Sequence, residues 1–407
     1  MGQKSLFIAQ NSNSINIFFI CGSQAFELDV VCFMKPIILH IIPTLGKAGA
    51  ETALVRLVSG SIARFPGFGH VVVVLTVPGF WSSELQSKNV SVFYLGLNGC
   101  SSIFSALFKS IKIVKNIKPS IIHGWMYHSC LLSFILHFFF RSSRIVWGIR
   151  NSVPVGSPSL TWLIRSVMAV LSRLDLVNIL YVSKESMSSH MTAGFSEKKG
   201  SIIPNFVNFN PGGVSLFHAN SHLNLNSPIR SIVILSVARY HKVKGHKIFL
   251  KSLSRLRSAD VNFVALMAGH GVDDDNLDLL SLREELGLKD CVSFLGHKSK
   301  MGDLFYASDI YCLHSLSEGF PNSLLEASSY GLTCVATKVG GVDEVVSNSS
   351  LLATPGSDVD LFHALKYACY LSDSERQNIG NANRKLVFDR FGENRILGLY
   401  NDFYEKL

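Results

Sequence analysis

The sequence predicts an α/β protein with two doubly wound parallel sheets, one in each half of the chain. The chain has 407 residues, which exceeds one ordinary hydrophobic core and favours two domains of roughly 150–200 residues each. From residue 36 onward, apolar runs of strand length alternate with amphipathic stretches of helix length. Such alternation is typical of parallel sheets covered by helices. A loop-rich stretch at 205–228, with Pro211-Gly212-Gly213 inside it, interrupts the pattern and is the predicted linker.

The predicted strands are runs rich in Val and Ile, and a Gly-rich or polar loop follows most of them. In the first half they are residues 37–42, 71–77, 92–95, 121–123, 145–149 and 179–182. In the second half they are 232–238, 262–268, 292–295, 310–313, 334–336 and 351–352. The last segment, 394–407, has apolar residues at helical spacing and is predicted to form an amphipathic helix. We therefore place the domains at 34–210 and 211–390.

Residues 1–33 do not fit the alternation. They contain a polar Asn/Ser stretch at 11–16 and a short apolar burst at 17–20, without the basic start and small-residue exit of a cleavable signal. Met34 directly precedes Lys35-Pro36 and the first clean strand. We expect residues 1–33 to be an upstream extension without a defined fold, and Met34 to be the natural start.

Cysteines and acidic residues give no metal site. The eight cysteines are scattered, and none forms a CxxC or Cys/His cluster, which suits free thiols in a reducing cytosol. The acidic runs Asp273-Asp274-Asp275 and Asp358-Val359-Asp360 lie in polar segments expected at the surface. We therefore expect no metal ligands.

The positive charge lies in the first half. Residues 1–219 hold 18 Lys and Arg against 7 Asp and Glu, whereas residues 220–407 hold 20 against 22. A basic half suggests an anionic partner surface, and lipid is favoured over nucleic acid because long aliphatic and Phe runs separate the basic residues. Ordinary solvated lysines are the alternative. The basic residues beside apolar runs are Lys109, Lys112, Lys115, Lys118, Arg141, Arg144, Arg165 and Arg173.

Residues 120–140 lack Asp, Glu, Lys and Arg, and their length suits a bilayer. The segment contains His123, His128, His137 and a glycine, however, and it begins like a strand. A strand, a turn and a helix of a parallel sheet explain it more simply than a membrane span.

Two groups of polar residues follow predicted strands in the second half. Arg239 and Lys244 follow one strand, and Gly245 allows close backbone approach before a helix that begins near His246. Cations at a strand end beside a helix N-terminus suit an anion, here a nucleotide diphosphate. The alternative is two exposed charges on a turn.

Glu318 and Glu326 follow the strand at 310–313, eight residues apart. Two such carboxylates suit sugar hydroxyls. Asn322 is the expected N-cap of the helix that carries Glu326, and a capping box from Ser323 to Glu326 is the structural alternative for the second carboxylate. Glu318, in a Gly-Phe-Pro loop, has no helix to cap.

The second half resembles the retaining glycosyltransferases of family four, also called glycosyl transferases group 1, and in particular their polysaccharide and O-antigen assembly members. Five features carry this resemblance: the Arg239/Lys244 pair, Gly269-His270-Gly271, Phe294-Leu295-Gly296-His297, the Glu-x7-Glu motif at 318 and 326, and Gly340-Gly341-Val342-Asp343-Glu344. The resemblance implies the GT-B architecture, in which two Rossmann-like domains face a central cleft. It also implies that the terminal helix at 391–407 returns to the first domain.

The resemblance also implies roles. Arg239 and Lys244 would neutralise the leaving diphosphate, Glu318 would hold hydroxyls of the donor sugar, and Glu326 would hold the ribose hydroxyls. Base recognition would use backbone groups near Gly269 and Leu295. The diphosphate or sugar would meet the helix N-terminus, formed by Phe320, Pro321, Asn322 and Ser323. His270 stands where many relatives carry Asp.

In the first half the resemblance points to the Gly-rich loop Leu45-Gly46-Lys47-Ala48-Gly49-Ala50-Glu51, in which Gly49 and Glu51 would border the donor phosphate and the acceptor. The alternative is an ordinary βα turn closed by glycines. The resemblance also places a histidine near the reacting sugar after the strand at 121–123. Trp125 occupies the position that is often His in relatives, so this role could fall to His123 or His128; a satisfied core histidine is the alternative. Arg150 and Asn205 match a cation and a Pro-Asn of the family, and for Asn205 a plain turn is equally open.

The implied function is transfer of a hexose or N-acetylhexosamine from a nucleotide diphosphate sugar, UDP-sugar favoured over GDP-sugar, with retained anomeric configuration and without a metal or other cofactor. The expected acceptor is a lipid-linked or other glycan at the inner face of the cytoplasmic membrane. The competing interpretations are a nucleotide-sugar 2-epimerase of the same fold and a catalytically idle scaffold of a polysaccharide assembly complex.

Overall fold

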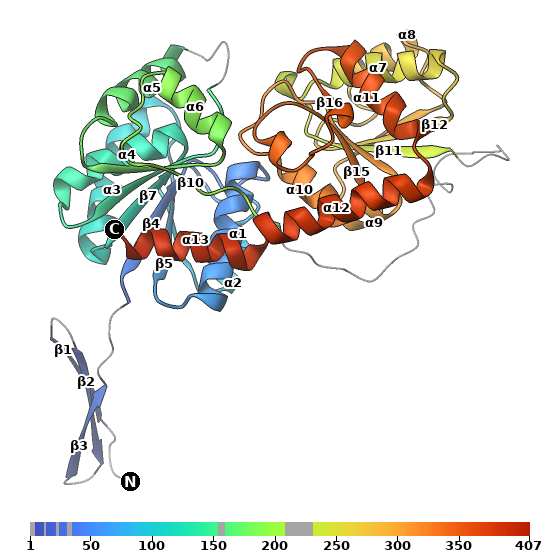
Figure 1. Cartoon of the computed structure of the whole chain (residues 1–407). Coiled ribbons are helices and arrows are strands. Elements are labelled where there is room, and N and C mark those ends of the chain that lie inside the picture. Colours follow the sequence, from blue (N-terminus) through green and yellow to red (C-terminus); the bar gives the residue numbers. More distant parts are fainter. Residues whose placement is uncertain (1–4, 12–13, 22–23, 31–34, 154–158, 208–230) are drawn as a thin grey trace.

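A computed structural model describes residues 5–11, 14–21, 24–30, 35–153, 159–207 and 231–407. Two α/β domains lie side by side, and the red helices at the C-terminal end of the chain run across both (Figure 1). Each domain is built around one parallel sheet.

The N-terminal domain contains a seven-stranded sheet in the order β10-β9-β8-β7-β4-β5-β6. Its strands are β4 (Ile37–Ile42), β5 (Gly69–Val74), β6 (Ser91–Tyr94), β7 (Ile121–Trp125), β8 (Arg144–Ile149), β9 (Val177–Tyr181) and β10 (Gly200–Ile202). Its helices are α1 (Gly49–Arg64), α2 (Ser82–Ser87), α3 (Ile103–Ile117), α4 (Met126–Phe139), α5 (Ser159–Leu171) and α6 (Lys184–Thr192). The central strands β4 and β7 are buried along nearly their whole length, because helices cover both faces of a parallel sheet.

The C-terminal domain contains a six-stranded sheet in the order β13-β12-β11-β14-β15-β16. Its strands are β11 (Ile232–Val237), β12 (Phe263–Ala268), β13 (Val292–Gly296), β14 (Ile310–Leu313), β15 (Thr333–Thr337) and β16 (Leu352–Ala353). Its helices are α7 (His246–Ser258), α8 (Leu277–Glu285), α9 (Met301–Tyr306), α10 (Asn322–Ser329), α11 (Asp358–Tyr370) and α12 (Asp373–Phe391). One continuous apolar core joins this sheet to its helices.

The last helix, α13 (Glu393–Glu405), packs on the N-terminal domain, whereas α12 packs on the C-terminal domain (Figure 1). Leu397 and Tyr404 belong to the same apolar cluster as α1 and β4. A Cβ added at Gly60 of α1 would lie 2.5 Å from Leu397, so the glycine permits close helix contact. Beside this crossing, the Val207 amide donates to the Phe391 carbonyl at 3.1 Å.

The predicted fold class is confirmed, and each predicted strand overlaps a strand of the structure. Strand β10 and helix α12 were not predicted. The predicted linker at 205–228 lies outside the described residues beyond residue 207. Residues 1–33 were expected to lack a defined fold, but β1 (Ser5–Asn11), β2 (Ser14–Cys21) and β3 (Gln24–Val30) form an antiparallel sheet there. That this segment is an upstream extension before a natural start at Met34 stays a prediction.

The apolar segment at 120–140 forms β7 followed by α4, as predicted, and α4 has only 14 residues. Within the described ranges, every helix is too short or too polar to cross a bilayer.

Candidate active site at the domain boundary

The predicted polar groups meet at one edge of the C-terminal sheet. From β11 the chain passes to β12 on one side, and later reaches β14 on the other side. Such a topological switch point is where open parallel sheets bind ligands, beyond the carboxyl ends of the strands. Arg239 and Lys244 follow β11 and Glu318 follows β14, so the two strands that flank the switch point supply both predicted groups.

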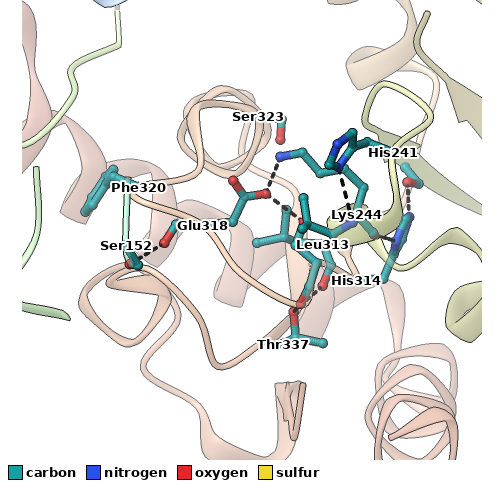
Figure 2. Close-up of polar contacts among 12 residues, drawn as sticks. Ser152, His241, Lys244, Leu313, His314, Glu318, Phe320, Ser323 and Thr337 are labelled. Carbon is teal, nitrogen blue, oxygen red and sulfur yellow. Dashed lines mark hydrogen bonds and ion pairs between the residues drawn. The ribbon is translucent and has the colours of Figure 1, made fainter. Parts of the chain in front are cut away.

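Lys244 and Glu318 are paired. Figure 2 shows the Lys244 ammonium pointing at the Glu318 carboxylate, and Lys244 Nζ lies 2.6 Å from Glu318 Oε1. The Ser315 hydroxyl donates to the same oxygen at 2.6 Å. The side chains are 21% and 12% exposed, so a partly buried ion pair occupies the predicted donor site.

His314 holds the Lys244 turn against the end of β14. Its Nδ1 donates to the Lys244 carbonyl at 2.5 Å, and its Nε2 lies 2.6 Å from the Ser236 hydroxyl. Its ring stacks on Phe249, and burial lowers its pKa well below the usual value. Gly245 has φ +71°, and an added Cβ would lie 2.1 Å from the His314 carbonyl oxygen. The close approach predicted for Gly245 is therefore present, and α7 follows at His246.

Glu326 is paired with the N-terminal domain. It lies in α10, and its Oε1 accepts from Arg56 Nη2 of α1 at 2.7 Å. The prediction that Asn322 is the N-cap of this helix was wrong, and the structural alternative of a capping box does not hold either. The N-cap residue is Pro321, without a side-chain capping bond. Asn322 is the first helical residue, and among the described residues its buried Oδ1 has no hydrogen-bond partner. Glu326 is thus held by an interdomain ion pair instead of a capping box.

The loop after Glu318 contacts the N-terminal domain through backbone groups. The Ser152 hydroxyl donates to the Glu318 carbonyl at 2.8 Å, and Asn205 Nδ2 donates to the Phe320 carbonyl at 3.2 Å (Figure 2 shows the first). A Cβ added at Gly319 would lie 2.3 Å from the Arg150 carbonyl oxygen. Only glycine therefore permits the two loops to approach this closely.

Arg150 and Asn205 have structural partners. Arg150 donates to the Asn205 side chain, to the Ile203 carbonyl at 3.2 Å and to Tyr400 of α13 at 3.1 Å. Asn205 thereby links Arg150 to Phe320. This arrangement ties the last described residues of the N-terminal domain and α13 to the donor loop, which goes beyond a plain turn at Asn205.

Gly269 needs its glycine for the same steric reason as Gly319. Its φ is +153°, and an added Cβ would lie 2.0 Å from the Ala238 carbonyl oxygen at the end of β11. Its amide donates to the Gly296 carbonyl, next to the predicted Leu295, at 2.9 Å. The ends of strands β11, β12 and β13 therefore lie close together at the edge of the sheet where Lys244 is located.

Further cationic groups lie at this edge. Arg239 is exposed, and the described residues give it no hydrogen-bond or ion-pair partner. Lys47, in the Gly-rich loop of the N-terminal domain, lies with its Nζ 2.8 Å from His297 Nε2. Burial lowers the pKa of His297, and the Lys47 cation and His270 lower it further. His297 Nε2 therefore accepts from Lys47 Nζ.

The remaining predicted residues of the Gly-rich loop and of α10 also meet at the boundary. A Cβ added at Gly49 would lie 3.6 Å from Asn322 Nδ2, which places the start of α1 opposite the start of α10. Glu51 accepts from the Thr44 hydroxyl at 2.6 Å and so braces its own loop. Ser323 accepts from Tyr311 at 2.7 Å.

His123 does not line this boundary. Its side chain is 1% exposed, its Nδ1 lies 2.8 Å from the Tyr404 hydroxyl, and its ring stacks on Trp125. Its position in β7 explains this, because the residue pairs in register with His40 and Val146 two residues before the strand ends. The core alternative therefore holds for His123. His128 lies in the first turn of α4 and is exposed.

The sequence analysis missed several residues of this site. Arg56, Ser152, His314 and Ser315 contact the predicted Glu and Lys side chains or their backbone. No local pattern distinguishes Arg56 from an ordinary solvated charge on a helix. The only available signal was that His314 and Ser315 directly follow a buried strand. Within the ranges that the structure describes, no three His, Cys, Asp or Glu side chains gather as a metal-binding group.

Comparison with known proteins agrees with this geometry. The family model for "Glycosyl transferases group 1" matches residues 220–386, the whole described C-terminal sheet and the residues around it. The C-terminal domain is therefore similar to that group. The matched region carries Arg239, Lys244, Glu318 and Glu326, and it contributes the sheet edge at which these residues meet.

Two curated relatives are each 27% identical to the chain. N-acetyl-alpha-D-glucosaminyl L-malate synthase of Bacillus anthracis aligns over 175 residues, 42% of this chain and 45% of that protein. The phosphatidylinositol N-acetylglucosaminyltransferase gpi3 subunit of Schizosaccharomyces pombe aligns over 316 residues, 72% of this chain and 65% of that protein. The chain thus spans about half to two thirds of the length of these relatives.

Among solved structures, Anabaena Alr3699/HepE in complex with UDP and glucose is similar to the chain, with a TM-score of 0.77 and 19% identity. The match covers 91% of this chain and all of that one. The similarity extends over both domains, so the fold is the two-domain GT-B architecture.

Proposed function

We propose that the protein is a retaining glycosyltransferase of the hexosyl type. It takes a hexose or N-acetylhexosamine from a nucleotide diphosphate sugar, with UDP preferred over GDP. The main observation is that Lys244 and Glu318 are partly buried and 2.6 Å apart at the switch point of the C-terminal domain. A cation for the diphosphate and a carboxylate for sugar hydroxyls thereby lie side by side. The names of the two relatives support an N-acetylglucosamine donor.

In the proposed reaction the acceptor hydroxyl attacks the anomeric carbon from the face that the diphosphate leaves. The new bond joins the acceptor oxygen to this carbon, the carbon–phosphate-oxygen bond breaks, and the departing phosphate takes the acceptor proton. Lys244 and Arg239 stabilise the charge that develops on the diphosphate, because preorganised cations act strongly in a site from which water is excluded. Glu318 holds the sugar. The two cations take the place of a divalent metal, so the reaction proceeds without one.

The proposed acceptor is a lipid-linked glycan, as in O-antigen or other cell-surface polysaccharide assembly, at the inner face of the cytoplasmic membrane. The support is the surface formed by α3, α4 and α5, here called the α3–α5 surface. Its exposed apolar side chains are Ile103, Phe104, Phe108, Ile135, Phe138, Phe139, Leu160, Trp162, Leu163, Val167 and Val170.

Lysines lie beside the apolar side chains of α3. On α3, Phe104 and Phe108 are 84% and 71% exposed and lie on one helix face with Lys112 and Lys115. Large contiguous apolar patches are rare on monomeric proteins and mark interaction sites. Apolar side chains with Lys and Arg around them suit the headgroup region of an anionic bilayer. The name of the Schizosaccharomyces pombe relative includes a lipid, phosphatidylinositol, which agrees with such an acceptor.

A thermal-shift panel with UDP, GDP, ADP, dTDP and CMP tests the donor assignment. A ligand at about a hundred times its dissociation constant stabilises the folded protein by about 2.7 kcal/mol. We expect one nucleoside diphosphate, UDP, to raise the melting temperature without added metal. No shift with any nucleotide would favour the idle scaffold, and conversion of a nucleotide sugar without an acceptor would favour the epimerase.

Flotation with vesicles containing anionic phospholipid tests the α3–α5 surface. The wild-type protein should float at low salt, and the double variant Phe104→Ser/Phe108→Ser should stay in the soluble fraction. Tyr370 of α11 is 67% exposed on the other domain, so Tyr370→Ser is the matched control and should float. Equal flotation of both variants would contradict the proposed membrane surface.

A further inference from the structure

Arg56 joins three parts of the molecule that lie far apart in the sequence. It lies in α1 of the N-terminal domain, and its Nη2 donates to Glu326 Oε1 of α10 at 2.7 Å. Its Nη1 donates to the carbonyl of Phe206 at 3.2 Å. Phe206 is 3% exposed and lies just before the interdomain segment. The guanidinium therefore fixes α10 relative to α1 and to the end of the first domain.

The geometry assigns Arg56 as a positioning residue for the nucleotide ribose, acting through Glu326. This inference rests on the proposed function, together with the role that the family resemblance implies for Glu326, which is to bind the ribose hydroxyls. An ionised carboxylate offers about four acceptor positions. Arg56 occupies one of them on Oε1, so the remaining positions can accept both ribose hydroxyls. Arg56 thus holds the carboxylate in one orientation, and stays in place when the nucleotide binds.

The ion pair has the properties that positioning requires. Its side chains are 26% and 28% exposed, so water screens it less than a surface pair. A planar guanidinium with two donors engaged has little freedom to rotate. Because Arg56 and Glu326 belong to different domains, the carboxylate takes this orientation only when the domains stand as they do here. The affinity for the ribose therefore depends on the interdomain arrangement.

The same helix offers a matched control. Arg64 of α1 forms an ion pair with Glu393 of α13, which lies outside the donor site. Arg64→Ala removes one guanidinium and one ion pair from the same helix, and leaves Glu326 and its partner in place. A general weakening of α1 would affect both variants, whereas a role in ribose binding affects only Arg56→Ala.

The test compares the binding of UDP and 2′-deoxy-UDP by calorimetry to the full-length wild type and to Arg56→Ala, Arg56→Lys, Glu326→Ala, the double variant and Arg64→Ala. We expect wild type to prefer UDP about tenfold. Arg56→Ala and Glu326→Ala should each remove most of this preference, and the double variant should lose no more than either. Arg56→Lys, a single-point cation, should recover part of it. Arg64→Ala should match wild type.

Turnover gives a second measurement. Arg56→Ala should raise KM for the donor sugar about tenfold with little change in kcat, since Arg56 acts on ribose binding and not on the reacting carbon. Wild-type preference for UDP in Arg56→Ala, or an equal loss in Arg64→Ala, would overturn the inference and leave the proposed function standing. If wild type bound no nucleotide, the proposed function would fail as well.

Discussion

Removal of either partner of the Lys244–Glu318 pair is expected to affect folding and turnover in different ways. Lys244→Ala leaves Glu318, 12% exposed, with only the Ser315 hydroxyl as a described side-chain donor. Glu318→Ala leaves the Lys244 ammonium, 21% exposed, without its carboxylate. The double variant Lys244→Ala/Glu318→Ala removes both charges. A double-mutant cycle of these three proteins separates the two effects.

The magnitude for folding follows from burial. Breaking a buried ion pair by removing one partner costs about 3–5 kcal/mol, and breaking a surface pair about 0–1 kcal/mol. This pair lies between these limits, so each single variant should lose about 2 kcal/mol of unfolding free energy. The double variant leaves no unpaired charge and should lose about 2–3 kcal/mol, which is well below the sum of the two single-variant losses. Urea titration measures these values as shifts of the transition midpoint at unchanged slope.

The expected loss of transition-state stabilisation is larger than the loss of unfolding free energy, and it has a different cause. Each side chain is assigned to the donor, so each single variant should lose at least about 3 kcal/mol of transition-state stabilisation, roughly a hundredfold in rate. The double variant should remain at least as impaired, because removing the second charge restores no contact with the donor. Initial rates with the nucleotide sugar identified by thermal shift measure this loss.

The pair Arg255–Asp358 supplies the control. It joins α7 to α11 in the same domain at 2.6 Å, with side chains 50% and 28% exposed. Its cycle should give a coupling energy below about 1 kcal/mol and near-normal rates. Near-normal turnover of Lys244→Ala or Glu318→Ala would refute the assigned roles. If the losses of stability in the Lys244/Glu318 cycle were additive, the two side chains would not stabilise each other, which would refute the assumed energy of the ion pair.

Three further outcomes are expected. Burial lowers the pKa of three histidines to about 4: His70, His190 and His246. These histidines bind protons near pH 6.5 in the unfolded chain but only near pH 4 in the folded protein. Lowering the pH from 7 to 5 should therefore reduce the free energy of unfolding by about 1–2 kcal/mol per histidine, and urea midpoints at the two pH values measure this loss. Gly269→Ala should unfold at markedly lower urea than Gly287→Ala, since the new Cβ would lie 2.0 Å from a carbonyl oxygen at the first position and in open space at the second; equal midpoints would contradict the steric argument. Initial rates should be unchanged by EDTA, and a loss that magnesium restores would disprove the metal-independent mechanism.

Much of the fold was predictable because its strands are apolar on both faces and bounded by Gly-rich or polar loops. Strand β4, for example, was predicted at its observed bounds, Ile37–Ile42. Helix α12 was missed because it is mostly polar, with only Gly380, Asn383, Val387 and Phe391 buried. Only two of these four buried residues, Val387 and Phe391, have apolar side chains, so the buried face gives little hydrophobic periodicity in the sequence.

The site was predictable only in part. Lys244 and Glu318 follow neighbouring strands of a parallel sheet, so topology brings them together. The partner of Glu326 is 270 positions away in the chain, and no local pattern encodes such a pairing. The error at His123 has a different cause. Both faces of β7 are buried. The sequence therefore does not distinguish a residue inside the hydrogen-bonded strand from a residue just beyond its end.

The Lys244–Glu318 pair also bears on what the donor must bring to the site. In the proposed reaction a diphosphate would draw the Lys244 ammonium away from the carboxylate, and Glu318, which is 12% exposed, would then lose its cation. Leaving a buried charge unpaired is unfavourable, so binding of the free nucleotide would have to overcome the loss of this ion pair. A nucleotide sugar would supply hydroxyl donors to Glu318 in the same step and keep both charged groups paired. Release of the free nucleotide after transfer is then favoured, because Lys244 and Glu318 pair again as it leaves.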